Sequence, residues 1–309
     1  MKSRLWIYIG LLFTMIVWSY SYVLIKVAYS YNITPKELVF IRLVLASTIL
    51  FAFSKVTKKL QRISKKDILP FLLLALFEPF LYYIGESNAM LYVSPTVGAV
   101  VISTIPVFVP FTMFFLFKEK INKSNLFGII ISFIGVCLVI LDDNYNFSVP
   151  LKGFLLLVFT VASAMGYSVV IRNLTKKYNS YTIVAYQMGI GAVFYSILLF
   201  SSDFNTLLKF QLSWQLIAST LVLAIFSTGI CYIIFSSGVR EIGVVKSSVF
   251  ANLIPVFTAI MAFLSGMESL PMRKLSGVII VILGVFMSQS KKPFLGIPGF
   301  FSNHFSKKK

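Results

Sequence analysis

Ionisable side chains are scarce in the long apolar stretches of this sequence, and the few that occur there are the first candidates for chemistry. Glu78 lies midway along one stretch, in the order Phe-Glu-Pro-Phe, and Glu86 follows within the same stretch. Arg42 lies within another. A charge inside a membrane costs several kcal/mol, so such a residue is usually kept for a function. Glu78 could bind an amine or carry a proton, and it could equally be a buried partner for Arg42.

The other two charges are expected to be less central. In a regular helix Glu86 lies about two turns beyond Glu78 and about 80° around the axis. We therefore expect Glu86 near the headgroups, either solvated or ion-paired. A lone buried guanidinium is costly, so Arg42 is expected to pair with Glu78 or Glu86.

Three prolines fall inside apolar stretches and predict irregular helices. Pro79 removes one backbone hydrogen bond and obstructs the preceding turn, which predicts an interruption that leaves carbonyl groups free beside Glu78. Such a break can coordinate a substrate, or it can be a kink that only improves packing. Pro106 and Pro255 are predicted to bend two further helices, either as hinges of a conformational change or as fixed bends.

Polar and aromatic side chains at similar depths could complete a substrate cavity around Glu78. An aromatic ring in an apolar helix can equally be a packing residue. With only one histidine in the chain, His304, neither a zinc site nor a histidine-activated nucleophile can be assembled, so we expect no metal and no cofactor. The candidate substrate-binding residues besides Glu78 are Trp18, Tyr82, Ser103, Tyr167, Gln187, Tyr232 and Asn252.

The elements that must position these residues are membrane-spanning helices. The chain has 309 residues, of which 58% are hydrophobic and only 12% charged, against about a quarter charged in soluble domains. A helix needs about 20 mainly apolar residues to cross a bilayer. The composition therefore predicts an all-α integral membrane protein. Ten stretches qualify as spans: 5–25, 36–55, 68–88, 95–117, 124–141, 151–172, 181–200, 214–237, 243–265 and 271–289.

The distribution of charge predicts the orientation. The net charge of +18 could suggest nucleic-acid binding, but most Lys and Arg residues fall in alternate loops between the expected spans. By the positive-inside rule this places both termini in the cytoplasm of a multi-pass cell-membrane protein, and we expect no nucleic-acid partner. The basic tail, residues 291–309, is expected to contact anionic lipids at the cytoplasmic face, with docking of a partner protein as the alternative.

The two halves of the chain are copies of each other. Residues 105–108, Ile-Pro-Val-Phe, recur at 254–257, an offset of 149 residues. Two five-helix repeats follow, residues 1–143 and 144–290. Because five is odd, the second copy must be inverted relative to the first, an architecture that places a substrate site near the midplane between the halves. The same register pairs Glu119 with Glu268, Leu126 with Leu275, Gly128 with Gly277, and Gly135 with Gly284.

These motifs, together with Phe40-Ile41-Arg42 in the second expected span, resemble the drug/metabolite transporter superfamily, and within it the EamA (RhaT-like) family of ten-helix transporters. The resemblance covers Trp6 to Gln289. It implies a substrate cavity between the halves, lined chiefly by the first, third and fourth helices of each. It also implies export of amino acids or other metabolites as the commonest activity.

The leading functional hypothesis is a secondary-active or facilitative exporter of an amino acid or similar small polar metabolite. No G-x-x-x-x-G-K-[ST] loop is present, so energy must come from a gradient, by uniport or by proton antiport. The alternative is a multidrug or lipophilic-cation exporter. That alternative is weakened because neither the first nor the sixth expected span contains an acidic residue. A remote alternative, an intramembrane lipid-modifying enzyme, lacks the clustered carboxylates that such chemistry uses, so no enzymatic activity is expected.

Overall fold

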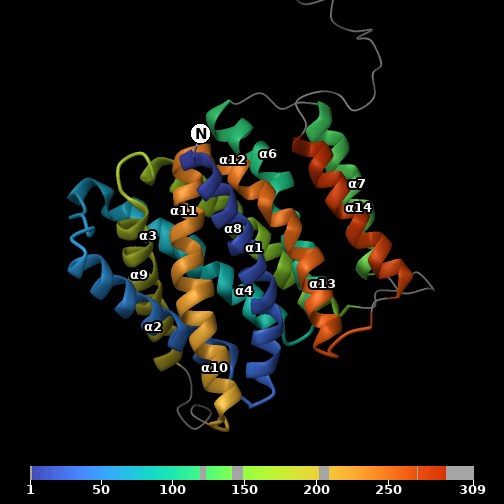
Figure 1. Cartoon of the computed structure of the whole chain (residues 1–309), viewed down its shortest axis with the longest axis horizontal. Helices are drawn as coiled ribbons and strands as arrows, with labels where there is room; N and C mark the ends of the chain where they lie inside the picture. Colours follow the sequence, from blue (N-terminus) through green and yellow to red (C-terminus); the bar gives the residue numbers. More distant parts are fainter. Residues whose placement is uncertain (1, 119–122, 141–148, 202–208, 270, 290–309) are drawn as a thin grey trace, which may run out of the picture.

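The computed structural model describes residues 2–118, 123–140, 149–201, 209–269 and 271–289, and every regular element in them is helical (Figure 1). The first half contains α1 (Lys2–Tyr29), α2 (Pro35–Val56), η1 (Lys65–Asp67), α3 (Ile68–Ala75), η2 (Leu76–Leu81), α4 (Tyr82–Ala89), α5 (Pro95–Ile102), α6 (Ile105–Phe117) and α7 (Lys123–Ile140). The second half contains α8 (Leu151–Leu174), α9 (Ser180–Phe200), α10 (Trp214–Val222), η4 (Leu223–Ile230), α11 (Cys231–Ile242), α12 (Val244–Ser248), η5 (Val249–Leu253), α13 (Ile254–Leu264) and α14 (Met272–Gln289).

Eight helical segments of the described chain are long and apolar enough to cross a membrane. The helices α7 and α14, of 18 residues each, lie where the sequence predicts the fifth and the tenth spans. The number of crossings stays a prediction. The eight segments are Leu5–Tyr29, Pro35–Val56, Lys65–Ala89, Pro95–Phe117, Leu151–Leu174, Ser180–Phe200, Trp214–Ile242 and Val244–Leu264.

Local sequence signals fix several helix ends. The start of α2 has a complete capping box, in which the Thr34 side chain accepts from the Glu37 backbone and Glu37 bonds back to Thr34, with Pro35 in the first turn. At the start of α9 the Asn179 side chain accepts a hydrogen bond from the backbone of Thr182. These caps satisfy N–H groups that a helix cannot satisfy itself.

The equivalent helices α2 and α9 pack against each other in opposite directions. Phe40, near the start of α2, packs edge-on against Phe200 at the end of α9, with ring centroids 6.5 Å apart. Phe53, near the end of α2, packs on Tyr181 at the start of α9, at 5.9 Å. Inverted copies require equivalent helices to run antiparallel, as these two do.

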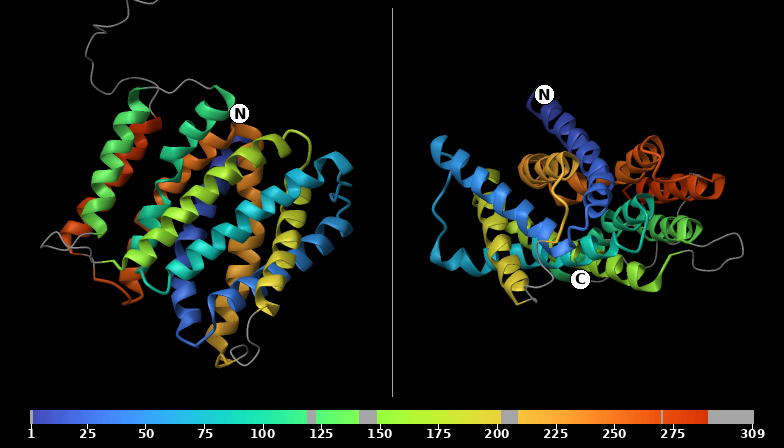
Figure 2. Two further views of the ribbon diagram at one scale, coloured as in Figure 1. Left: turned by 180° about the vertical axis from the view of Figure 1, so that it is seen from behind. Right: turned by 90° about the horizontal axis from the view of Figure 1, so that it is seen from below.

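The equivalent helices α7 and α14 form a second antiparallel pair at one margin of the bundle (Figures 1 and 2). A Cβ at Gly135 would lie 2.8 Å from the carbonyl oxygen of Gly277, and one at Gly284 would lie 2.8 Å from that of Gly128. Gly135 is the repeat equivalent of Gly284, and Gly277 is that of Gly128. The two contacts are therefore related by the repeat, and the interface is symmetric. Glycine is needed here because the backbones approach closely.

The third helix of each half is interrupted by a π-helical segment, η2 in the first half and η4 in the second. At Glu78 the backbone is extended rather than helical (φ −148°, ψ 118°), and the Glu78–Pro79 peptide bond is cis. The interruption predicted at Pro79 is therefore present. Its counterpart in η4 carries Ser227 and Thr228 at the positions equivalent to Glu78 and Pro79.

The fourth helix of each half is also broken, but not as a bend centred on its proline. Pro106 lies in the first turn of α6, after a two-residue turn that ends α5. Pro255 lies in the first turn of α13, after the 3-10 segment η5. The first turn tolerates proline because its N–H groups have no partner inside the helix. The predicted kinks are thus corrected to symmetric breaks, with each proline starting a new helix.

The two halves interleave rather than stand side by side (Figure 2). In the first half α1 packs against α11 and α13 of the second half, and in return α8 packs against α4 and α6. Likewise α2 contacts η4 while α9 contacts η2. Both interrupted third helices are therefore held by elements of the opposite repeat, which brings η2 and η4 to the centre of the molecule.

Candidate functional site

A polar chamber of about 50 Å³ lies between the two interrupted helices. It is smaller than the roughly 300–1,000 Å³ of typical ligand pockets. Six residues that the sequence singles out line it: Glu78, Tyr82, Trp18, Tyr232, Arg42 and Glu86. The remaining lining residues are Ser21, Tyr22, Tyr83, Ser227 and Ile254.

Glu78 is buried in the chamber, and its carboxylate is held from the opposite half. The Tyr232 hydroxyl donates a hydrogen bond of 2.5 Å to Glu78 Oε1. Two carbonyl groups at the break also accept side-chain hydrogen bonds: Gln187 Nε2 donates to the Glu78 carbonyl at 2.8 Å, and Ser163 Oγ donates at 2.5 Å to the Phe77 carbonyl, which accepts from the Tyr82 backbone as well. Side chains of α8 and α9 therefore bind these two carbonyl groups. The group at this break that could bind a substrate is the Glu78 carboxylate.

The ion pair predicted for Arg42 is not formed with either glutamate. Arg42 is 1% exposed, and its Nη2 donates to the Tyr83 hydroxyl at 3.2 Å and to Thr228 Oγ1 at 3.1 Å. The guanidinium carbon also lies 4.7 Å from the centre of the Tyr83 ring. Hydroxyl groups and a π face thus replace a carboxylate partner. The Nη1 group has no hydrogen-bond partner in the described part of the protein.

Glu86 faces the same chamber, contrary to the expectation of a solvated or ion-paired residue near the headgroups. Its side chain is buried, and Tyr82 donates a hydrogen bond of 3.3 Å to Oε1. Tyr22 is a further close neighbour. The expectation was wrong because it assumed 100° per residue throughout, whereas π turns and one extended residue separate Glu78 from Glu86 and change the phase of the helix.

Trp18 connects the chamber wall to the second interrupted helix. Its Nε1 donates to the carbonyl of Ser227 at 3.1 Å. The ring packs edge-on against Tyr232, with centroids 5.5 Å apart, and against Phe235 at 5.4 Å. The Ser227 carbonyl is the repeat equivalent of the Glu78 carbonyl bound by Gln187, so each break has one carbonyl capped by a side chain from another helix.

Four candidate substrate-binding residues are not among those lining the chamber: Tyr167, Gln187, Ser103 and Asn252. Tyr167 is buried close to Gln187. Ser103 Oγ donates to the Val100 carbonyl at 2.7 Å, within its own helix. Asn252 is 1% exposed, and both polar atoms of its amide lack a partner in the described residues. Depth along the sequence alone did not reveal which side of each helix faces inward.

Some lining residues outside the predicted set have a signal in the sequence. Tyr22 and Ser21 follow Trp18 by about one helical turn, so at least Tyr22 shares its face. Ser227, which lines the chamber, is the repeat equivalent of Glu78, and Thr228, which accepts from Arg42, is that of Pro79. Applying the repeat offset to the site residues themselves would have placed the second wall of the chamber.

Glu268 caps the start of α5. It accepts hydrogen bonds from Ser94 Oγ at 2.9 Å and from the Thr96 backbone at 2.8 Å, at the start of α5. Lys274 Nζ lies 3.8 Å from Glu268 Oε2. Glu268 thus joins the second repeat to the first. Its equivalent, Glu119, and the basic tail 291–309 lie outside the described residues.

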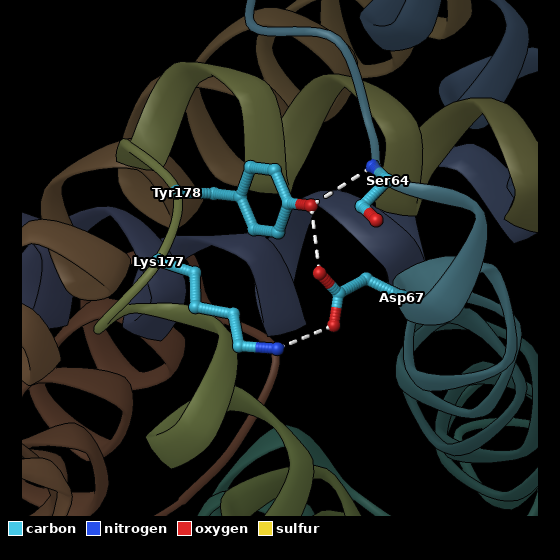
Figure 3. A network of polar contacts seen from close by, with 4 residues as sticks. All are labelled: Ser64, Asp67, Lys177 and Tyr178. Carbon is cyan, nitrogen blue, oxygen red and sulfur yellow. Dashed lines mark hydrogen bonds and ion pairs between the residues drawn. The ribbon is translucent and has the colours of Figure 1, made fainter.

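A second polar network joins the halves at the loops before α3 and α9 (Figure 3). Asp67 accepts hydrogen bonds from Lys177 Nζ at 2.6 Å and from the Tyr178 hydroxyl at 2.8 Å. The same hydroxyl accepts from the Ser64 backbone at 3.0 Å. The hydrogen bond to Asp67 raises the pKa of Lys177. This network is a structural latch, remote from the chamber.

Comparisons with known proteins agree with this architecture. The family model of the EamA-like transporter family matches twice, over residues 5–141 and 151–289. An uncharacterized transporter of Archaeoglobus fulgidus is 28% identical over 90% of this chain and 96% of its own length. The uncharacterized transporter YyaM of Bacillus subtilis is 30% identical over 77% of each chain. A solved crystal structure shares the fold, with a TM-score of 0.67 at 14% identity over 90% of this chain and 95% of the other. This chain, a multi-pass membrane protein built from two copies of one domain, therefore belongs to the EamA-like transporter family.

Proposed function

We propose that the protein is a secondary-active or facilitative exporter of an amino acid or a similar small polar metabolite. In this proposal it works by alternating access in the cell membrane, with ten spans and both termini in the cytoplasm. The observation that carries the proposal is the polar chamber between the repeats, which contains two carboxylates and a guanidinium whose Nη1 has no partner among the described residues.

The chamber composition favours a zwitterionic solute. Arg42 Nη1 is buried and has no hydrogen-bond partner in the part of the chain that the structure describes, so it can donate to a substrate carboxylate. Glu78 and Glu86 can accept from an ammonium group, and the rings of Trp18 and Tyr232 add cation–π surface. An α-amino acid carries both of these charges, on two groups that are bonded to the same carbon atom.

The small size of the chamber favours alternating access. At about 50 Å³ it must widen to admit a metabolite. Its walls come from both repeats, so a rocking movement of one repeat against the other would enlarge it toward one face and then toward the other. The breaks in the third and fourth helices supply short rigid pieces for such a movement.

The test is flux of labelled amino acids in proteoliposomes, with the substrate first chosen by comparing metabolites inside and outside cells that overproduce or lack the protein. We expect Glu78→Gln to lower flux about tenfold or more and to abolish its response to an imposed pH gradient, at an unchanged yield of folded protein. Glu241→Gln, at an exposed carboxylate, is the matched control. Unchanged flux in Glu78→Gln would remove this carboxylate from the mechanism.

Export of a lipophilic cation is the second candidate, because aromatic rings around two carboxylates also suit a cationic solute. The buried charge of Arg42 opposes it. Growth of cells that overproduce the protein, in the presence of quaternary ammonium compounds, separates the two. Resistance that depends on Glu78 would favour the cation exporter.

A further inference from the structure

A second and larger cavity, of about 810 Å³, opens at the end of the bundle where α8 and α11 end and α12 begins. Four basic side chains line it: Arg172 from the end of α8, Lys176 from the turn after α8, Arg240 from the end of α11, and Lys246 from α12. Among the described residues that line this cleft, no side chain is acidic. We call this cavity the basic cleft.

The surroundings of the cleft strengthen its field. The remaining wall is largely apolar and includes Met113, Val239 and Val244, all buried. Charges of one sign in a concave surface with apolar walls focus the electric field and raise the local concentration of the opposite ion. A solute with a carboxylate or phosphate group is therefore attracted to this cleft, and a cation is repelled.

The cleft lies in line with the chamber. Tyr232 lines the chamber and Val239 lines the cleft, and both belong to α11. A spacing of seven residues, about two helical turns, places them on one face of this helix, about 10 Å apart. Between them Phe235 packs on Trp18, with centroids 5.4 Å apart. Along this helix the ring contact of Phe235 with Trp18 therefore lies between the residue that lines the chamber and the residue that lines the cleft.

A buried amide, that of Asn252, lies in the chain between a residue that lines the cleft and a residue that lines the chamber. In the segment η5, Val249 lines the cleft, while Ile254, which follows η5, lines the chamber. Asn252 lies between them in the chain, fully buried, and neither amide atom has a partner in the described residues. A buried amide without hydrogen-bond partners is unfavourable, which favours a role that uses its hydrogen bonds.

We propose that the basic cleft binds the anionic group of a solute, a carboxylate or a phosphate, before the solute passes to the chamber, and that it excludes cations. The assignment of the cleft to the transport route rests on the proposed function. The proposal that the cleft binds an anion is independent of that function. The same chemistry could come from a soluble solute or from the headgroup phosphate of a lipid.

The charge preference is tested with a cysteine placed in the cleft, Val245→Cys, in protein whose Cys137 and Cys231 are replaced by alanine. Its reaction rates with anionic sulfonatoethyl and cationic trimethylammonioethyl methanethiosulfonate are compared with those of Ser265→Cys, an exposed residue that follows α13. We expect the anionic-to-cationic rate ratio to be about tenfold higher in the cleft. Equal ratios at the two positions would overturn the proposal.

A pair of double variants assigns the preference to the cleft. Arg240→Gln with Lys246→Gln should bring the ratio to that of Ser265→Cys. Lys65→Gln with Lys66→Gln removes the same charge from exposed residues that do not line the cleft, and should leave the ratio high. If both double variants lowered the rate ratio equally, the preference would come from the general surface potential of the protein, and the cleft would not be a site.

Binding and its source are tested by protection of Val245→Cys from the anionic reagent in nanodiscs. Slower labelling with inorganic phosphate or L-glutamate in phosphatidylcholine discs supports a site for soluble anions. Slower labelling only when phosphatidylglycerol is added keeps the anion site and overturns its place on the transport route. No protection in either lipid overturns the proposal. Labelling is measured without transport, so a failure of the proposed export would leave these results standing and distinct.

Discussion

The two interrupted helices share a backbone plan and differ in charge. Both contain a π-helical segment at repeat-equivalent positions, η2 and η4, and each contacts the second helix of the opposite half. Gln187 of α9 donates to the Glu78 carbonyl, and Arg42 of α2 donates to the Thr228 hydroxyl. Within the second helices, Val39 aligns with Val184, and in that register Arg42 and Gln187 are equivalents.

The two repeats keep the interruption at the same place, while its backbone, which is extended at Glu78 in η2, and its charges have diverged. All three charged residues of the chamber, Arg42, Glu78 and Glu86, come from the first repeat. The second repeat supplies neutral groups, including Ser227 and Tyr232. An inverted pair of identical halves would present identical charges to both faces. The charges of this chamber are instead asymmetric. The first repeat supplies the charged side chains, and the second repeat supplies neutral groups that contact them.

The largest effect is expected from Arg42, which is both a chamber charge and a tether to η4. We expect Arg42→Gln to lower flux about a hundredfold, because it removes the only guanidinium of the chamber and leaves two buried carboxylates without a nearby cation. Arg42→Lys should restore little, since an ammonium cannot place separate N–H groups on Tyr83 and Thr228 in the same geometry. Flux in proteoliposomes is the measurement.

An exchange variant sharpens this prediction. If the two tethers were interchangeable, Arg42→Gln with Gln187→Arg would recover function. We expect it to stay inactive, because the glutamine would place a neutral group in the chamber and the arginine would lie outside its lining. Recovery of at least half of the original flux would contradict the assignment of the charge to one repeat.

Much of the fold could be predicted from the sequence, because hydrophobic stretches and a constant repeat offset report helix positions and symmetry directly. The two antiparallel glycine contacts of α7 and α14 follow from the same register. The site was harder. Glu86 was misplaced because an interrupted helix changes phase, and Arg42 was assigned a carboxylate because hydroxyl partners such as Thr228 have no signature in sequence.

The next effect compares the two capped carbonyls. Gln187→Met removes the hydrogen bond to the Glu78 carbonyl, and Trp18→Phe removes that to the Ser227 carbonyl. A buried group left unpaired costs about 1–3 kcal/mol. We expect Gln187→Met to lower the thermal midpoint in detergent more than Trp18→Phe, because the Glu78 backbone is extended and has no helical bond to fall back on.

A result in the opposite order would be informative in its own right. It would mean that the π-helical turn at Ser227 depends on its side-chain cap more than the extended residue at Glu78 does. The hydrogen bond from Ser163 to the Phe77 carbonyl would then be the main support of the first break. Ser163→Ala, measured in the same assay, distinguishes that case by an unfolding shift larger than the one in Gln187→Met.

The smallest effect is expected far from both breaks, in the latch that joins the loops before α3 and α9. Lys177→Gln should leave flux unchanged and lower the thermal midpoint less than Trp18→Phe does, because the Lys177 side chain is 60% exposed and its ion pair with Asp67 is screened by water and salt. Asp67→Asn should lower the midpoint further, since it also weakens the hydrogen bond from Tyr178. Adding salt should shrink the difference between the original protein and Lys177→Gln while leaving the Trp18→Phe difference intact, which separates a solvated ion pair from a buried cap. A large loss of flux in Lys177→Gln would mean that the two repeats transmit strain from their loops to the chamber.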